Sequence, residues 1–460
     1  MKSKGLTVFL CLTALVIGAF LRGFKLDTLM VFTGDQGRDF LITRDLILGK
    51  NFPLFGPPTS LSWFKLGPFI YYFWSPFLLL GKFNPLSLGY LSIAIDIAAI
   101  FAMFYLLLRN IDLKTALVGA FLYAACPFAI LHSRMPLHVN LSAFFTILSL
   151  ILLTEYLRSK KNIYFFILCF ILGVFIQIHL TAIILIGVFF AFLYKKIKIN
   201  YLLIGLFVFL FPLIPFLIGD SRESFVMSGK IITWFPYRLL SAFGFLTSKN
   251  ILSANKILNV FSIIIKVANE IVYLPNRTIA LIVLIILILC DIIMKRKCLL
   301  LKITNWLLAA FIISFFLHGE PSEHYFVIIL PLVIIIESIS LRRRFLIPLV
   351  IFLILANTIF LPNNNYFSQV SLGEEIATVR EIINDSGGKD YQIETPSDIV
   401  NLPGYYRQYQ YLGWWLGHEP SSNAQGRKYI IYERKKNLTL DQKHQVVKEL
   451  EHIVIVRAFN

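Results

Sequence analysis

The chain has 460 residues, of which 57% are hydrophobic, 15% aromatic and only 15% charged. Soluble globular proteins carry about 25% charged residues, so this composition excludes a soluble enzyme of two or three domains. Five cysteines are too few for a disulfide scaffold, and the blocks of apolar residues exclude a disordered chain. The net charge of +17 would suggest nucleic-acid binding in a soluble protein, but here we expect it to orient a membrane protein and to bind no nucleic acid.

The apolar blocks have about the length that a membrane-spanning helix needs, roughly 20 residues. Several of them are short. In chain order the candidate spans are 6–24, 67–81, 87–108, 115–131, 140–157, 163–178, 179–194, 199–218, 274–294, 303–317, 325–341 and 345–361.

Basic residues collect on the cytoplasmic side of membrane proteins, and they orient these spans. The strongest clusters are Lys2 with Lys4, Arg158 with Lys160 and Lys161, Lys195 with Lys196 and Lys198, Lys295-Arg296-Lys297 with Lys302, and Arg342-Arg343-Arg344. The loops between them, 132–139, 219–273 and 318–324, then face outward. The alternation of sides agrees with these clusters only if one early segment does not cross the membrane, and 67–81 is the best candidate. We expect a multi-pass protein of the cell membrane with 11 to 13 crossings, a cytoplasmic N-terminus and an extracytoplasmic C-terminus.

The composition changes abruptly after residue 361, where charged and apolar residues mix as they do in globular domains. We therefore divide the chain into a membrane domain, 1–361, and a small soluble α/β domain, 362–460, on the outer side. Within this tail the patterns predict helices at 373–384 and 440–450 and strands at 428–433 and 453–456. The fold class is thus an all-α membrane bundle with a small C-terminal α/β domain.

The first outer loop, 25–66, contains the segment Gly34-Asp35-Gln36-Gly37-Arg38-Asp39. Asp35 and Asp39 are four residues apart, so on a helix they share one face. Asp35 either caps the start of this helix, where a carboxylate meets free amide groups, or acts as a general base toward an acceptor hydroxyl or amine.

Other polar residues on the outer side allow two interpretations each. Lys65 lies among aromatic residues, either in an interfacial belt or against a lipid phosphate, and Arg134 contacts either headgroups or a phosphate. The segment 318–325 has two carboxylates and two imidazoles, which form a solvated turn or, less in keeping with their spacing, a divalent-cation site. Gln177 and His179 are expected to line the same cavity or to bond between helices. Asp96, in the middle of a span, is either structural or functional.

Three motifs carry a resemblance to a known family: the segment 34–39, Lys65-Leu66-Gly67-Pro68, and Tyr325 to Pro331. With the order of spans and the outer C-terminal domain, they resemble the GT-C glycosyltransferases, in particular the protein O-mannosyltransferases and the aminoarabinose transferases to lipid A. The resemblance implies a polyprenyl-phosphate sugar donor and an inverting transfer at the outer face to a glycan, lipid or protein acceptor. It also implies Asp35 as the base and Lys65 on the donor phosphate.

The candidate site residues combine the outer clusters with this resemblance. Asp35 and Asp39 are the candidate catalytic residues. The candidate substrate-binding residues are Lys65, Arg134, Arg38, His179, Glu320 and Tyr325.

The sequence departs from the family at three positions. Gln36 stands where a second acid is common, Lys65 is followed by Leu-Gly-Pro rather than Pro-Pro, and Asn140 occupies a region where an acid is common. The first departure favours a reaction without a metal or other cofactor, although a divalent cation is possible.

Two other classes of protein remain as alternatives. A transporter or flippase of a lipid-linked or small polar substrate would place its binding groups at midplane, as Asp96 does, but the other polar clusters lie at one face. A non-catalytic scaffold would use the tail, where the run 405–411 and Trp414-Trp415 form either a partner surface or a helix that packs the tail on the membrane.

Overall fold

The computed structural model describes residues 2–61, 63–246, 253–272, 277–293, 298–319, 321–341, 370–394, 406–421, 427–433 and 444–458, with the single positions 348, 351 and 355. The first half of the chain contains α1 (Lys2–Gly23), α2 (Leu26–Leu29), α3 (Gly34–Ile47), α4 (Phe69–Leu80), α5 (Leu86–Asn110), α6 (Leu113–Ala125), α7 (Pro127–Ser133), η1 (His138–Leu141), α8 (Ser142–Ser159), α9 (Asn162–Ile178), α10 (Ala182–Leu193), α11 (Ile199–Leu210), η2 (Phe211–Leu213) and α12 (Ile214–Arg222). Then follow α13 (Val226–Ala242), α14 (Ala254–Val272), α15 (Arg277–Ile293), α16 (Leu299–His318), η3 (Glu323–Phe326) and α17 (Leu330–Leu341). The tail contains α19 (Leu372–Ser386), β1 (Tyr391–Glu394), α20 (Arg407–Trp415), β2 (Arg427–Glu433), β3 (His444–Glu449) and β4 (Ile453–Ala458).

Several helices have the length and composition of membrane spans. Within the described residues, five are long and apolar enough: Gly5–Gly23, Leu86–Asn110, His138–Ser159, Ile199–Arg222 and Leu299–His318. Four shorter apolar helices, α4, α9, α10 and α17, have 10–17 residues. The expected multi-pass helical membrane part is therefore confirmed. The number of crossings and their orientation stay predictions, and nearly all of the candidate span 345–361 lies outside the described residues.

The candidate span 115–131 is not one straight helix. It divides into α6 and α7, whose axes are bent by 57° relative to each other. Pro127 begins α7, and its missing N–H group removes the hydrogen bond that would have continued α6. The carbonyl groups at the end of α6 consequently need other donors.

One of these donors is Arg22 of α1, whose side chain is fully buried. Its guanidinium donates to the carbonyls of Ala124 (2.7 Å) and Tyr123 (3.2 Å), and its Nε lies 2.6 Å from Oδ2 of Asp96. The Tyr123 hydroxyl donates to the other Asp96 oxygen at 2.8 Å. Asp96 thus joins α5 to α1 and α6, and of the two interpretations left open for it these contacts favour the structural one.

The segment 67–81 contains α4, which has only 12 residues. A helix of this length is about 18 Å long, well short of the roughly 30 Å of a hydrocarbon core. It packs against α3 and α5. The helices α10 and α17 also have 12 residues, so length does not set this segment apart, and its failure to cross the membrane stays a prediction.

The segment 219–273, predicted as an outer loop, is instead largely helical, with α13 and α14 inside it. In α14 the buried residues Val260, Val267, Ala268 and Ile271 recur at helical spacing and form one apolar face. This face packs against α7, α15 and α16. The loop interpretation failed because polar residues on the other face of α14 leave no continuous apolar run of the length that was taken to mark a span.

The C-terminal tail has the expected α/β architecture. Its four strands form one sheet in the order β1-β2-β4-β3, in which β1 and β2 are parallel and the other neighbours are antiparallel. The predicted helix at 373–384 corresponds to α19, which ends at Gly387 with a φ of 62°. The predicted strands at 428–433 and 453–456 correspond to β2 and β4.

The prediction of a helix at 440–450 is wrong. Residues 444–449 form β3, and residues 440–443 lie outside the described part of the chain. Val446 of β3 pairs with Val456 of β4, and Gln445 pairs with Arg457. Pairing with a buried neighbouring strand outweighs the weak helical preference of the charged residues in this segment.

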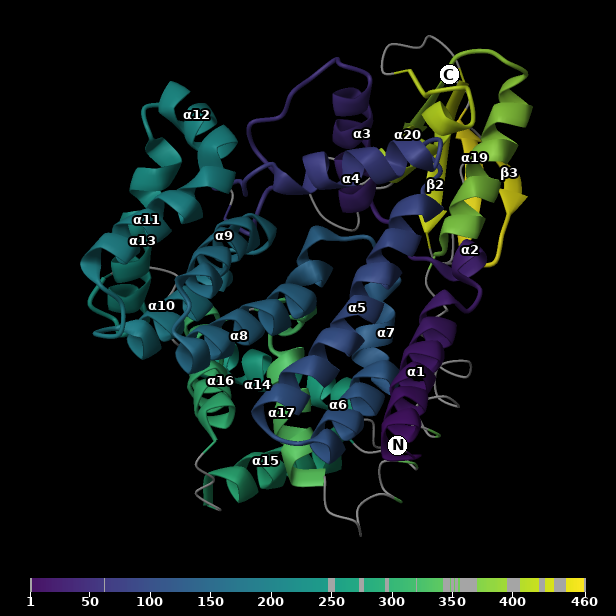
Figure 1. Ribbon diagram of the computed structural model, residues 1–460. Coiled ribbons are helices and arrows are strands. Elements are labelled where there is room, and N and C mark those ends of the chain that lie inside the picture. Colours follow the sequence, from purple (N-terminus) through teal and green to yellow (C-terminus); the bar gives the residue numbers. More distant parts are fainter. Residues whose placement is uncertain are drawn as a thin grey trace.

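The tail is not detached from the membrane part. The backbone N–H of Leu372 donates to the carbonyl of Met30 at 2.7 Å, α19 packs on α2, and α20 packs along α3. Figure 1 shows α3, α4, α19, α20 and the sheet together at the end of the molecule that lies away from the N-terminus. The described part of the aromatic run, with Tyr409 and Tyr411 fully buried, therefore packs the tail against the first loop.

Candidate active site

The first turn of α3 presents the acidic segment. The backbone N–H of Thr33 donates to Oε1 of Gln36 at 2.7 Å, and Nε2 of Gln36 donates to the carbonyl of Val31 at 3.1 Å. Gln36 is fully buried and acts as the capping partner of this helix. Asp35 is therefore not the capping residue, and its side chain remains 67% exposed. The position where the family often has a second acid is used here to fix the start of the helix.

Arg38 joins the two carboxylates of this turn. Its NH1 lies 2.6 Å from Oδ1 of Asp35, and its Nε lies 2.8 Å from Oδ1 of Asp39. The hydroxyl of Tyr71, on α4, donates to the same Asp39 oxygen at 3.1 Å. Asp35 and Asp39 thus lie together as the sequence predicted, but they differ in access because the Asp39 side chain is only 1% exposed.

The environment of Asp39 keeps it ionised. Burial alone would raise its pKa, but the nearby His138 ring and the Arg38 guanidinium outweigh burial and hold the pKa below the ordinary 3.8. Nδ1 of His138 lies 3.8 Å from Oδ2 of Asp39. Asp39 is therefore a buried carboxylate that orients its neighbours.

His138 also faces a pocket of about 350 Å³. The pocket is formed by the loop before α4, η1, the turn between α9 and α10, α13, the end of α16, and η3. Its principal polar side chains are those of His138, His179, Arg238, His318, His324 and Tyr325. Most of the remaining lining is aliphatic or aromatic. Such a mixture suits a ligand with an apolar part and a few oxygen atoms.

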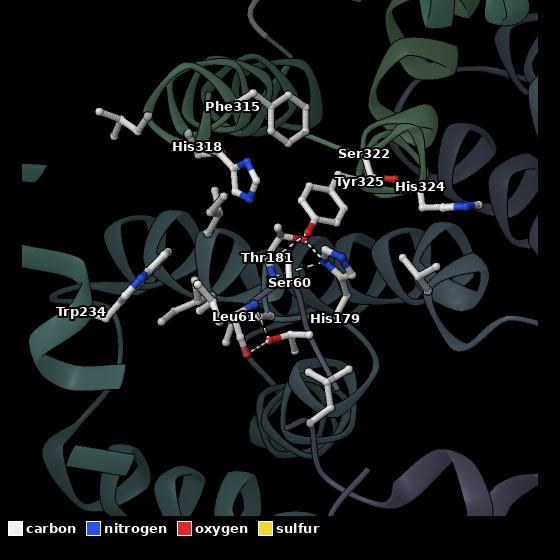
Figure 2. Close-up of a pocket in the computed structure, with 18 of the residues that line it drawn as sticks. Ser60, Leu61, His179, Thr181, Trp234, Phe315, His318, Ser322, His324 and Tyr325 are labelled. Atoms are coloured by element: carbon white, nitrogen blue, oxygen red, sulfur yellow. Dashed lines mark hydrogen bonds between the residues drawn. The ribbon is translucent and has the colours of Figure 1, made fainter. Parts of the chain in front are cut away.

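Tyr325 lies at the centre of this pocket. Its hydroxyl donates to Oγ of Ser60 at 2.9 Å, and its ring centroid lies 4.9 Å from that of His179 and 5.4 Å from that of His318. Figure 2 shows the Tyr325 ring pointing toward Ser60, His179 and Thr181. The structure thus brings together two of the predicted substrate-binding residues, His179 and Tyr325, which lie 146 positions apart in the sequence.

The acidic turn and the pocket are neighbours. His138 contacts both, since its ring lies beside Asp39 and also lines the pocket. Burial lowers the pKa of His324, while Glu323 and Asp35 act to raise it. Lys65 is exposed, forms an antiparallel bridge with Pro58, and is followed by Leu66 of the pocket lining. Its Nζ lies 5.6 Å from the centroid of the Phe55 ring.

One other candidate is not part of this arrangement. Arg134 is buried, and its NH1 donates to the carbonyls of Arg22 (3.1 Å) and Phe24 (2.7 Å), where it holds the end of α1. These contacts favour a structural role over the predicted phosphate contact. Glu320 lies outside the described residues. Gln177 does not line the pocket either, because its amide donates to the carbonyls of Gly173 and Pro212.

Two side chains at the site were not singled out from the sequence. Arg238 of α13 lines the pocket and donates to the carbonyls of Leu317 and His318, each at 3.0 Å. Arg238 is a basic residue in a segment assigned to the outer side, where basic residues are uncommon. Arg134 was singled out on that ground, and the same ground would have singled out Arg238. Tyr71 is one of the aromatic residues that follow Lys65, and its contact with Asp39 could not be seen from local spacing.

Within the ranges that the structure describes, no group of three or more His, Cys, Asp or Glu side chains is arranged to hold a metal ion. The histidines of the pocket are spread over η1, the turn between α9 and α10, the end of α16 and η3. Glu323, which neighbours one of them, contacts Lys266 of α14 instead.

These features define a class of protein: a multi-pass membrane protein with short helices in the loop after its first span, a pocket beside them and a C-terminal α/β segment. Among solved structures, the chain is similar to ArnT from Cupriavidus metallidurans bound to undecaprenyl phosphate, with a TM-score of 0.62, 12% identity and coverage of 98% of both chains. The apo structure of that protein has a TM-score of 0.62 and 11% identity, with 99% of this chain and 98% of that chain covered.

The apo oligosaccharyltransferase of Archaeoglobus fulgidus is also similar, with a TM-score of 0.50 and 13% identity over 93% of this chain and 69% of that chain. No family model matches the sequence, and no curated protein matches it. The chain therefore shares the fold of these structures, which confirms the fold that the resemblance to the GT-C glycosyltransferases implied.

Proposed function

We propose that this protein is a membrane glycosyltransferase that moves a sugar from a polyprenyl-phosphate donor to an acceptor at the outer face of the membrane. The observation that carries the proposal is the exposed carboxylate of Asp35. It is linked through Arg38 and Asp39 to His138, which lines a pocket of about 350 Å³ at the predicted outer end of the membrane domain. The ArnT structure of the same fold has undecaprenyl phosphate bound, which supports a lipid-phosphate donor.

In this proposal Asp35 is the general base. The acceptor oxygen or nitrogen attacks the anomeric carbon, Asp35 takes the acceptor's proton, and the bond to the phosphate breaks so that polyprenyl phosphate leaves with the electron pair. Attack from the face opposite the phosphate inverts the configuration. The protein's contribution is to position both substrates and to stabilise the departing charge.

Positive charge for the phosphate comes from Lys65 and Arg238 in this scheme. Lys65 lies at the edge of the pocket on a short antiparallel turn, and Arg238 is in its lining. A lysine is a compact charge suited to a phosphate oxygen, and an arginine offers two parallel donors. Arg38 has another task, because it is bonded to both carboxylates of the acidic turn. It orients Asp35 relative to the acceptor.

The test is a transfer assay with purified protein and a panel of radiolabelled polyprenyl-phosphate sugars in lipid vesicles. Asp35→Asn should abolish transfer while leaving donor binding intact. Asp27→Asn is the matched control, because Asp27 is an exposed carboxylate on α2 of the same loop. Wild-type activity in Asp35→Asn would remove Asp35 as the base.

A second measurement tests donor recognition. Lys65→Ala should weaken the binding of a polyprenyl-phosphate sugar at least tenfold, which corresponds to about 1.4 kcal/mol. An unchanged affinity would contradict the phosphate contact. If the wild-type protein transferred no sugar but carried the labelled lipid across the vesicle membrane, the transporter alternative would replace the proposed function.

A further inference from the structure

The contact between α3 and α20 depends on a glycine inside the acidic turn. A Cβ atom added to Gly37 would lie 2.2 Å from the backbone N of Gln408 and 2.4 Å from the carbonyl carbon of Arg407. These distances are far inside van der Waals contact, and the atoms concerned are backbone. A side chain at position 37 would therefore push the two helices apart, since no rotamer change can relieve the overlap.

Aromatic and charged side chains hold the rest of the same interface. The Tyr411 ring packs edge-on against Phe40 at 5.3 Å, and its hydroxyl donates to the carbonyl of Phe83 at 2.7 Å. Near the other end of α3, the Arg44 guanidinium lies 4.9 Å from the Trp414 ring. The tail therefore contacts α3 along its length.

The opposite side of α3 is held by the membrane part. Tyr71 of α4 bonds to Asp39, and His138 of η1 lies beside the same carboxylate. The turn with Asp35 and Arg38 is thus held between α4 on one side and α20 on the other. A small displacement of α3 would move the charged groups of Asp35, Arg38 and Asp39 relative to the pocket.

We infer that the C-terminal segment positions the catalytic turn, and that Gly37 is the positioning residue through which α20 does so. This inference rests on the proposed function, because it assigns the tail a part in the transfer reaction. Transfer requires the base and the acceptor to be aligned, and a displacement of about 1 Å can reduce a rate about 100-fold. The rate of transfer should therefore depend on a contact made by residues some 370 positions away.

Gly37→Ala in the full-length protein is the first test. We expect its kcat to fall about 10- to 100-fold, while the affinity for the lipid donor changes less than about twofold, because the pocket and Lys65 are untouched. The matched control is Gly187→Ala in α10, where an added Cβ meets no atom within 4 Å. Its kcat and donor affinity should both equal those of the wild-type protein.

Arg44→Gln provides a second variant if Gly37→Ala does not fold. It removes the contact with Trp414 and the 3.4 Å contact with Glu419 but leaves the acidic turn unchanged in sequence. The same signature is expected, a lower kcat at unchanged donor affinity. Hydrogen exchange measured by mass spectrometry should show faster exchange in α3 for both variants and not for Gly187→Ala.

The outcomes separate the two proposals. An active wild-type protein with unchanged kcat in both variants would overturn the positioning role and leave the proposed function intact. A loss of donor affinity equal to the loss of kcat would also overturn it, because that result indicates general damage to the site. A wild-type protein that transfers no sugar from any donor would overturn the proposed function and with it this inference.

Discussion

The buried ion pair between Arg22 and Asp96 allows a quantitative prediction of stability. Arg22 is fully buried, and the Asp96 side chain is 11% exposed. Asp96→Asn preserves the size of the side chain and one acceptor oxygen, but it removes the negative charge 2.6 Å from the guanidinium. The carbonyls of Ala124 and Tyr123 still accept hydrogen bonds from Arg22, yet as neutral groups they do not compensate its charge.

Removing one partner from a buried pair destabilises proteins by about 3–5 kcal/mol, because an uncompensated charge stays buried. We expect Asp96→Asn to lower the free energy of unfolding by about this amount. The measurement is SDS-induced unfolding of the purified protein in mixed micelles, followed by tryptophan fluorescence. Asp45→Asn is the control, because its pair with Arg44 is nearer the surface and should contribute no more than about 1 kcal/mol.

Equal stability of Asp96→Asn and the wild-type protein would refute this reasoning. It would mean that another group or water compensates the charge of Arg22 when Asp96 is replaced. A loss of sugar transfer in Asp96→Asn without a loss of stability would restore the functional interpretation that the sequence left open for Asp96.

Three further predictions follow from the site. Gly67→Ala would place a Cβ 2.2 Å from Oε1 of Gln177 and should cost about 1–3 kcal/mol of stability, measured as above, whereas an unchanged value would show that this amide can move aside. Tyr71→Phe removes a donor to the Asp39 carboxylate and should lower the free energy of unfolding by about 1.5–3 kcal/mol, which the same titration checks. Burial lowers the pKa of His324 below 6.5, so as the pH falls the unfolded chain binds a proton at this histidine before the folded chain does. The contribution of His324 to the free energy of unfolding should therefore be complete above about pH 6.5 and decrease below it, and His324→Gln should flatten that decrease.

The sequence predicted the membrane architecture well, because a single local property, apolar length, decides it. It also predicted α19, β2 and β4 in the tail, where periodicity and turn residues agree with the fold. It failed where a distant partner decides the structure. Residues 444–449 became a strand because β4 lies beside them, and the helices in 219–273 form against α7, α15 and α16. The bend between α6 and α7 was also not predicted, but its cause is local, since Pro127 is visible in the sequence.

The candidate site divides in the same way. Asp35 and Asp39 are four positions apart, so their proximity could be predicted from helical geometry. The resemblance to a family supplied a role for Asp35, but spacing could not show that one carboxylate would be exposed and the other buried. The structural contacts of Arg134 could not be predicted, because its partners are the carbonyls of Arg22 and Phe24, and a backbone carbonyl leaves no signature in a sequence.

The distribution of the site along the chain has a mechanical consequence. The acidic turn belongs to the first loop, the pocket is completed by η1, α13 and η3, and α20 of the tail closes the far side of α3. The proposed base, Asp35, and one proposed phosphate cation, Lys65, belong to the first loop, but the other proposed cation, Arg238, comes from α13. The helix that bears Asp35 is short and lies outside the set of helices long enough to span a membrane, so the bilayer alone does not fix its position. Contacts with α4 and α20 must do this, and for that reason a glycine in the acidic turn is as closely tied to the proposed reaction as the carboxylates beside it.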